Sequence, residues 1–246
     1  MTIRVGIGGW NYEPWRGTFY PPGTAQKREL EYASRQVTAI EINSTYYGSQ
    51  KPESLANWAA AVPDGFKFSV KASRFATNRK VLADGGESVA RFLGQGIDRL
   101  GDRLGPINWQ FMATKAFERD DFARFLDLLP ETLGSPPLRH ALEVRHESFR
   151  DPAFLDLARA RNMAVVFADS DAFPCIDEQT ADFTYARLQR TVEEQATGYD
   201  DAALDQWATR ARQWADGRRD VYAFFIAGAK VRNPAAAQAL LARLQS

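Results

Sequence analysis

Eight short runs of apolar and β-branched residues divide the chain, and an amphipathic stretch follows most of them. The runs are Ile3–Trp10, Ala39–Thr45, Phe66–Ser73, Pro106–Met112, His140–His146, Ala164–Ser170, Phe183–Gln189 and Val221–Gly228. Between the runs, apolar residues recur at the i, i+3, i+4, i+7 spacing of a helix. The helical series are Leu55, Trp58, Ala59 and Val62, then Phe122, Phe125, Leu126 and Leu129, then Leu204, Trp207, Ala208 and Ala211.

This alternation predicts a parallel sheet with helical crossovers. Eight units in 246 residues favour a (β/α)8 TIM barrel, an α/β fold, with residues 1–246 as a single domain. Asp151-Pro152 and Asn233-Pro234 each place a capping residue before a proline and predict two helix starts. Asp171–Asp182 has little helical pattern, so we expect an irregular crossover between strands six and seven. An open doubly wound sheet is the alternative fold.

Composition adds limits on the class of protein. Lys plus Arg and Asp plus Glu both number 31, so the net charge is zero and no large basic face for nucleic acid is indicated, although a local patch stays possible. Cys175 is the single cysteine, which rules out an intramolecular disulfide. The chain opens without a signal-peptide pattern and has no run of membrane-spanning length. We therefore expect a cytoplasmic protein without a membrane partner, of unknown oligomeric state.

Alternation within the predicted strands turns polar side chains toward the barrel interior. Residues that face the covering helices should be apolar, as Ile40 and Ile42 are, which leaves Glu41 and Asn43 facing inward. In five strands this argument turns inward Glu41, Asn43, Thr45, Ser69, Lys71, Ser73, Asn108, Gln110, Met112, Glu143, Arg145, Tyr185, Arg187 and Gln189. Barrel interiors are usually apolar, and a buried charge is costly unless it is paired. The five charged groups form either a closed network or a ligand pocket.

The pocket interpretation assigns roles to these charges. Active sites of this fold lie at the carboxyl ends of the strands. Lys71, Arg145 and Arg187 would hold an anion there. Glu41 or Glu143 would act as general acid or base, with a pKa set by the neighbouring cations.

Four further residues complete the predicted site on these strands. Asn43, Gln110 and Tyr185 would orient the ligand through hydrogen bonds. His146 ends the fifth strand and is a third candidate acid or base, with a histidine bonded to a neighbouring loop carbonyl as the alternative.

Basic and aromatic residues occupy the loops that follow the strands. Tyr46 follows the second strand, and Lys230 precedes the helix start at Pro234. A helix N-terminus beside a basic side chain can hold an anion, and the last two loops of this fold commonly bind phosphate. Aromatic residues beside basic ones can also stack on bases, which leaves a nucleic-acid partner open.

Cofactor motifs are incomplete. Gly6-Ile7-Gly8-Gly9 follows a strand, but Asn11 replaces the third glycine of a dinucleotide loop. His140 and His146 are the only histidines, so a His-rich metal site is excluded by number. A carboxylate site for Mg²⁺ or Mn²⁺ stays open, although the interleaved cations would compete for its ligands, which would be Glu41, Glu143, Asp169 or Asp171. We predict neither a metal nor a cofactor.

Several segments resemble the YecE-like family, also called domain of unknown function 72, along nearly the whole chain. They are Gly8–Tyr12, Trp15–Pro21, Glu41–Tyr47, Phe66–Lys71, Leu104–Ile107, Gln110-Phe111, Glu143–His146, Ser148-Phe149, Ala168-Asp169 and Phe183–Leu188. The resemblance implies a (β/α)8 barrel and no established activity. It adds Trp10 and Asp169, which lie in matching segments, to the candidate ligand-binding residues.

Two segments depart from the family pattern. Gln189-Arg190 stands where the family usually has His-Gly, and Ile226–Lys230 stands where an Asn-rich turn is usual. The added cations Arg190 and Lys230 favour a more anionic ligand. A nucleic-acid role like that of barrel endonucleases has been considered for the family, but those enzymes use a His-rich zinc cluster that this sequence lacks.

Three functions follow from these observations. The first is an enzyme, a hydrolase or a lyase or isomerase, that acts on a small anionic ligand such as a phosphate or a sugar acid. The second is a nucleic-acid binder or phosphodiesterase that uses the basic and aromatic rim. The third is a non-catalytic binding or regulatory protein whose interior charges are purely structural.

Overall fold

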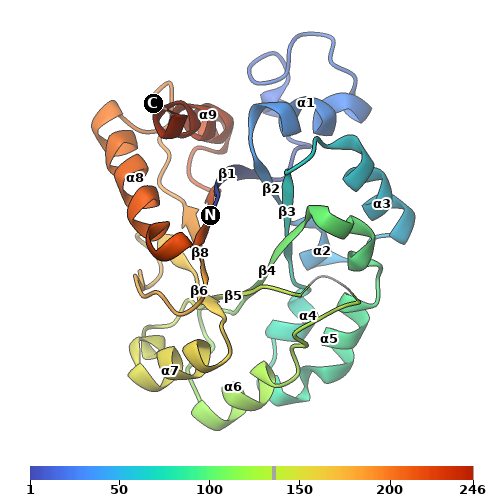
Figure 1. Ribbon diagram of the computed structural model, residues 1–246, viewed down its shortest axis with the longest axis vertical. Helices are drawn as coiled ribbons and strands as arrows, with labels where there is room; N and C mark the ends of the chain where they lie inside the picture. The colour runs from blue at the N-terminus through green and yellow to red at the C-terminus, as the bar shows by residue number, and fades with distance from the viewer. Residues whose placement is uncertain (135–136, 246) are drawn as a thin grey trace.

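Parallel strands form a ring, and helices surround it (Figure 1). The computed structural model describes residues 1–134 and 137–245. Within them the strands are β1 (Ile3–Gly8), β2 (Ala39–Ile42), β3 (Lys67–Lys71), β4 (Leu104–Gln110), β5 (His140–Glu143), β6 (Ala164–Val165), β7 (Phe167–Asp169), β8 (Phe183–Leu188) and β9 (Asp220–Phe225). The predicted α/β barrel architecture is confirmed.

Helices connect most consecutive strands on the outside of the ring. They are α1 (Glu29–Gln36), α2 (Ser44–Tyr47), α3 (Pro52–Ala61), α4 (Arg74–Thr77), α5 (Gly86–Leu93), α6 (Arg119–Leu126), α7 (Pro152–Ala160), α8 (Asp201–Trp214) and α9 (Asn233–Gln245). Short 3-10 turns precede several of them, including η5 (Glu147–Arg150) and η7 (Lys230–Arg232). None of the helices in the described ranges is long and apolar enough to cross a membrane.

The ring closes at a divided strand. The sheet order is β6-β5-β4-β3-β2-β1-β9-β8-β7, so the two ends of this order are neighbours in the chain, separated by Val166. Leu142 of β5 pairs with Val165, and Phe167 pairs with Ala186 of β8. The sixth predicted strand therefore pairs with β5 through its first half and with β8 through its second half.

The crossover from β7 to β8 contains no helix in residues 170–182, as the sequence predicted. Thr180 holds this segment against the barrel, because its hydroxyl donates to the Met163 carbonyl at 2.7 Å and accepts from the Val165 amide at 2.9 Å. Phe173 of the same segment lies against Arg145, 4.2 Å from the guanidinium carbon to the ring centre. The irregular segment thus covers part of the charged interior.

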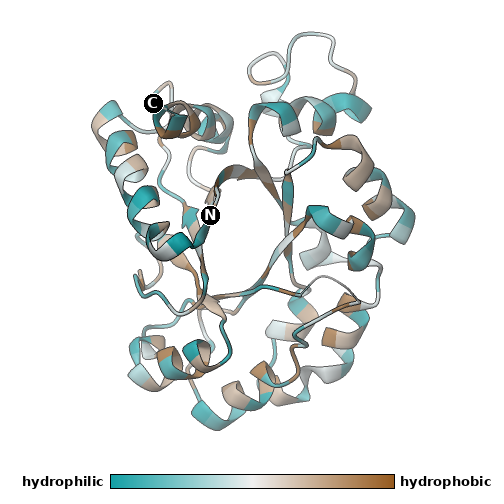
Figure 2. Ribbon diagram, in the orientation of Figure 1, coloured by the Kyte–Doolittle hydropathy of each residue, from teal (hydrophilic) through white to brown (hydrophobic). Residues whose placement is uncertain are grey.

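Side chains alternate between the two sides of the ring as predicted. Ile40, Val70, Trp109 and Leu142 pack in the outer core with the helices. A separate apolar cluster fills the lower interior and contains Ala39, Ala141, Ala164, Val166, Phe183, Tyr185, Tyr222 and Phe224. Figure 2 shows brown apolar residues and teal polar residues mixed along the ring of strands. The polar interior residues lie above this apolar layer, toward the carboxyl ends of the strands.

Gly6 in β1 lies against the backbone of β2. A Cβ atom at this position would lie 2.2 Å from the Ala39 carbonyl oxygen, so β1 can approach β2 only with glycine here. The strand pairs with β2 and β9 on its two sides. Gly6 therefore serves strand packing.

Two helix boundaries differ from the sequence prediction. Leu129 was expected in the helix with Phe122, but α6 ends at Leu126 and Leu129 follows in a turn. Asn233 was expected as a cap, but it has helical backbone angles and begins α9 itself. Its side-chain oxygen instead accepts a hydrogen bond from the Thr191 hydroxyl at 2.9 Å, which ties α9 to the preceding loop. Asp151 caps α7 as predicted, accepting from the Ala153 amide.

Candidate functional site

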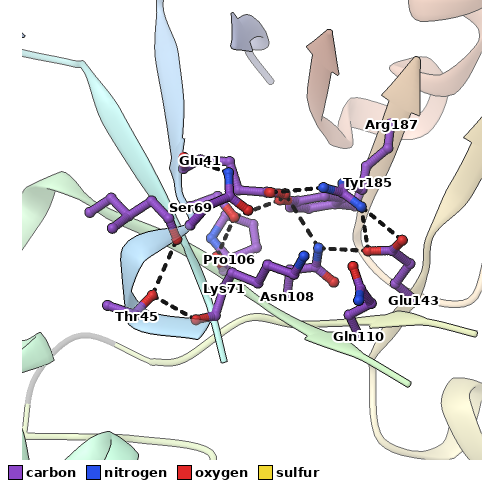
Figure 3. Close-up of polar contacts among 12 residues, drawn as sticks. Glu41, Thr45, Ser69, Lys71, Pro106, Asn108, Gln110, Glu143, Tyr185 and Arg187 are labelled. Carbon is purple, nitrogen blue, oxygen red and sulfur yellow. Dashed lines mark hydrogen bonds and ion pairs between the residues drawn. The ribbon is translucent and has the colours of Figure 1, made fainter. Parts of the chain in front are cut away.

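Arg187 binds two carboxylates inside the barrel (Figure 3). From β8, its Nη1 lies 2.7 Å from both carboxylate oxygens of Glu143 on β5, and its Nη2 lies 3.0 Å from Glu41 Oε1 on β2. These three side chains are nearly inaccessible, with 3%, 1% and 0% of their residue surface exposed, respectively. Ionised groups this deeply buried must neutralise one another. The closed-network interpretation therefore applies to these three charges, which we call the buried triad.

Hydrogen bonds satisfy the remaining acceptors of the buried triad. The Tyr185 hydroxyl donates to Glu41 Oε2 at 2.6 Å and lies 2.7 Å from the Ser69 hydroxyl. The Asn108 amide nitrogen donates to Glu41 Oε2 at 3.3 Å and to Glu143 Oε2 at 3.1 Å. Tyr185 thus holds the Glu41 carboxylate in place. Burial and the neighbouring Glu41 charge raise the pKa of the Tyr185 hydroxyl well above its usual range.

Arg145 extends this arrangement toward the surface. Its Nη2 donates to Glu143 Oε1 at 2.7 Å and to Gln110 Oε1 at 2.8 Å, while 21% of its side chain stays exposed. Burial alone would raise the pKa of Glu143, but the charges of Arg187, Arg145 and Lys71 outweigh burial and lower that pKa to about 2. Glu143 is therefore an ionised acceptor at neutral pH and has no proton to donate.

An open cavity of about 530 Å³ lies above the triad, at the carboxyl ends of the strands. The predicted site residues that line it are Trp10, Asn43, Lys71, Arg187 and Lys230. Asn43 also donates to the Glu41 backbone carbonyl at 3.3 Å. The interior therefore has three layers: an apolar base, the buried triad, and a cavity that a small ligand can enter.

Lys71 ends β3 at the boundary between the triad and the cavity. Its ammonium lies 4.4 Å from the centre of the Tyr46 ring, and 8% of the residue is exposed. Burial lowers the pKa of Lys71 and Arg187 lowers it further, and the opposing carboxylates leave it at about 8. Among the described residues, no carboxylate lies within ion-pair distance of this ammonium.

Lys230 contributes a second ammonium from the loop after β9. Its Nζ lies 4.1 Å from the centre of the Tyr12 ring, and its backbone carbonyl accepts from the Trp15 indole nitrogen at 2.9 Å. Burial lowers the pKa of Lys230 as well. Two lysines that rest on tyrosine rings, and that have no acidic partner in the described part of the chain, thus line one cavity.

Three other predicted residues lie away from the cavity lining. His146 caps η5, where its Nδ1 lies 2.8 Å from the Ser148 hydroxyl. Asp169 and Arg190 form an ion pair at 2.5 Å, and the Tyr199 hydroxyl donates to the same carboxylate at 3.1 Å. His140 lies buried between the Trp109 indole and the Pro130 carbonyl. The three predicted site residues His146, Asp169 and Arg190 therefore support loops at the carboxyl ends of the strands, whereas His140 lies at the start of β5.

Several residues that line the cavity were not predicted as site residues, among them Trp58, Gln50 and Asn233. Trp58 belongs to an apolar helical series, but its ring packs edge-on against Trp10, with centres 5.0 Å apart. Gln50 and Asn233 also line the cavity from loop and helix positions. The alternation rule addresses strands only, so it had no means of selecting these three residues.

Two buried polar atoms near the triad have no hydrogen-bond partner among the described residues: Asn108 Oδ1 and Arg187 Nε. An unsatisfied buried polar atom is costly. The polar centre of the barrel therefore retains capacity for additional hydrogen bonds. For metals, no group of three or more His, Cys, Asp or Glu residues suited to hold an ion occurs within residues 1–134 and 137–245.

Fold and site together define a (β/α)8-barrel protein with a buried ion-pair triad beneath an open polar cavity. The chain belongs to the family described as "Protein of unknown function DUF72", whose sequence model matches residues 4–246. The resemblance noted from the sequence is confirmed. UPF0759 protein YecE of Escherichia coli strain K12 is 27% identical over 148 residues, 60% of this chain and 50% of that protein. The chain spans about half the length of the curated relatives it matches.

Solved structures show the same fold. A DUF72 family protein from Thermotoga maritima superposes with a TM-score of 0.75 at 23% identity, over 98% of this chain and 97% of that one. A DUF72 family protein from Enterococcus faecalis gives 0.75 at 16% identity, over 100% and 98%. D-psicose 3-epimerase from Clostridium cellulolyticum, solved with D-tagatose, gives 0.53 at 12% identity, over 98% of each chain. At these identities the likenesses establish the barrel fold alone.

Proposed function

We propose that the chain is an enzyme that binds a small anionic ligand, phosphate-like or sugar-acid-like, in the cavity above the buried triad. Hydrolysis or a lyase or isomerase step is the reaction class. The observation that carries the proposal is that Lys71 and Lys230 line the same cavity while no carboxylate in the described residues neutralises either ammonium. Unpaired positive charges in a concave, partly desolvated site attract anions.

The charged residues have different roles in this proposal. Arg187 is committed to Glu41 and Glu143, so the triad serves as a fixed floor for the cavity. Lys71 has a pKa of about 8 and can exchange a proton near neutral pH, which is the range in which general acid–base catalysis is efficient. Lys230, in the loop after β9, supplies a positive charge that binds the anion. In this proposal Lys71, rather than Glu143, moves protons.

A thermal-shift screen tests the proposal. The purified protein is melted with phosphorylated sugars, sugar acids, nucleotides and divalent metals, because a ligand at ~100 times its Kd stabilises by about 2.7 kcal/mol. We expect anionic ligands to raise the melting temperature of the wild type and of Lys27→Ala, an exposed control. Lys230→Ala should lose most of the shift. An absent shift across the panel, or an equal shift in Lys230→Ala and Lys71→Met, contradicts the proposal.

A second candidate function, nucleic-acid binding, has its own supporting observation at the rim. Tyr47 and Phe75 are 65% and 58% exposed, and the Arg74 guanidinium lies 5.8 Å and 5.4 Å from their ring centres. Exposed aromatic rings beside an arginine suit stacking on unpaired bases. Binding of a fluorescent single-stranded oligonucleotide should then fall steeply with salt and fall in Tyr47→Ala. Binding that does not respond to salt rejects this candidate.

A further inference from the structure

Lys71 differs from the other buried lysine of the described residues in what surrounds its amine. Lys115, equally buried, bonds Asp121 at 2.7 Å and the Lys80 carbonyl at 2.7 Å. The Lys71 ammonium has neither kind of partner and rests on the Tyr46 ring face. Its backbone carbonyl is fixed by the Thr45 hydroxyl at 2.7 Å. The main chain is therefore anchored while the amine remains free of strong acceptors.

The charges around Lys71 oppose its protonation. Glu41 and Glu143 are its nearest counter-charges, but both are already bonded to Arg187. With Lys71 protonated, the two carboxylates face Arg187, Arg145 and Lys71, so the five groups carry a net charge of +1. Burial and this excess of cations lower the pKa of Lys71 to about 8, so about a tenth of the amine is neutral at pH 7.

A neutral amine in a cavity is a nucleophile. Lysines become reactive when they are desolvated or placed beside another cation, and their characteristic reaction is imine formation with a carbonyl carbon. Lys71 lines the cavity, so a ligand held there can reach its amine. The nearest aromatic ring covers one side of the amine, which limits the approach to the cavity side.

We propose that Lys71 forms an imine with an anionic aldehyde or ketone whose charged group is held by Lys230. This inference rests on the proposed function and names its substrate class. The neutral Lys71 amine forms a C–N bond to the carbonyl carbon, and one proton moves from that nitrogen to the carbonyl oxygen to give a neutral carbinolamine. Loss of that oxygen as water, with one further proton taken from solvent, gives the iminium. In sum, amine, carbonyl and one proton yield iminium and water.

The iminium product suits its surroundings. It carries the same single positive charge as the protonated lysine, so the electrostatic balance with Glu41 and Glu143 is unchanged once the bond has formed. Its C=N bond withdraws electrons from the adjacent carbon, which is the property that lyase and isomerase reactions next to a carbonyl require. The water released can leave through the open cavity.

Reductive trapping tests the proposal directly. The wild-type protein is incubated with pyruvate, glyoxylate or dihydroxyacetone phosphate and then reduced with borohydride. We expect a mass gain equal to the carbonyl compound less one oxygen, located on the peptide that contains Lys71. The adduct should saturate with concentration and should far exceed labelling of exposed Lys27 or ion-paired Lys115. Lys71→Arg keeps the charge but lacks a nucleophilic amine at neutral pH, so its adduct at this position should disappear.

A second variant and a binding measurement separate the two proposals. Lys230→Ala should lower trapping of the three anionic compounds by tenfold or more, while trapping of the uncharged aldehyde propanal on Lys71 persists. If no compound labels Lys71 in the wild type, the imine is rejected. If the same compounds still raise the melting temperature, anion binding stands without covalent chemistry. Labelling spread evenly over the exposed lysines also rejects the imine.

Discussion

Nη1 of Arg187 lies 2.7 Å from both carboxylate oxygens of Glu143, 44 residues away in the chain and on the opposite side of the divided strand. The Arg187 guanidinium therefore links β8 to β5 at the divided strand. There, within the described ranges, β6 pairs only with β5 and β7 pairs only with β8. Glu41 adds a third strand to this link. The buried triad ties the barrel together at the level where its main-chain ladder is interrupted.

Removal of Arg187 alone should be severely destabilising. Arg187→Met leaves two buried carboxylates facing each other, and loss of one partner of a buried ion pair costs about 3 to 5 kcal/mol. The urea unfolding midpoint measures this loss. The triple variant Glu41→Gln, Glu143→Gln, Arg187→Met retains acceptors for Tyr185 and Asn108 without the charges, and it should recover most of the stability. A triple variant as unstable as Arg187→Met would show that charge imbalance is not the cause.

Replacement of Lys71 by methionine should stabilise the protein at neutral pH. The pKa of Lys71 falls from 10.5 to about 8 on folding, so the unfolded chain binds the proton more tightly. Burial of Lys71 therefore lowers the free energy of unfolding by about 3 kcal/mol below pH 8, and this loss disappears as the pH rises toward 10.5. Urea midpoints of wild type and Lys71→Met at pH 7 and pH 10 measure it. A gain of the same size at both pH values would contradict the lowered pKa, and Lys27→Met should show no gain at either pH.

Glu143 should make the stability sensitive to acid. Its folded pKa of about 2 lies below the ordinary glutamate value of 4.5, so it stabilises the fold by about 3 kcal/mol above pH 4.5 and loses this effect as the pH falls toward 2. Glu143→Gln should therefore be less stable than wild type at pH 7, with the difference closing near pH 2. Glu87→Gln, at an exposed ion pair with Arg91, serves as the control and should show no such convergence.

Arg190 should stabilise the loop after β8 through Asp169. The Asp169 side chain is buried while 51% of the Arg190 side chain is exposed, so Arg190→Ala leaves the carboxylate with the Tyr199 hydroxyl as its remaining side-chain donor among the described residues. We expect a loss of about 1 to 2 kcal/mol. A double-mutant cycle with Asp169→Asn measures the coupling between the two side chains. Additive effects of the two changes would show that the ion pair contributes nothing to stability.

Strand alternation predicted the interior of the barrel because it depends on local geometry alone. Ile40 and Ile42 had to face the helices, and Glu41 followed between them, whatever the rest of the chain did. The choice between a closed network and an open pocket depended on distances between strands, which the sequence does not contain. The structure has a closed ion-pair network and an open cavity at different depths: Arg187 is enclosed by carboxylates, and Lys71 borders the cavity.

The residues that escaped prediction act through tertiary contacts. Asn233 matched a helix cap, but the hydroxyl of Thr191, 42 residues earlier, bonds its side chain and leaves it inside α9. Trp58 matched an apolar helix face, and only the position of Trp10 brings it to the cavity. In both cases a partner distant in the chain decides the role of the side chain.

The order of the buried triad along the chain has a consequence for synthesis on the ribosome. Glu41 is made 146 residues before Arg187, the group that neutralises it. At 5 to 20 residues per second, that interval is roughly 7 to 30 seconds, during which a partial barrel would enclose the Glu41 carboxylate without its ion-pair partner. Compaction of the nascent chain is therefore opposed until β8 has emerged. The buried Glu41 charge is therefore expected to disfavour closure of the lumen before β8 has been made.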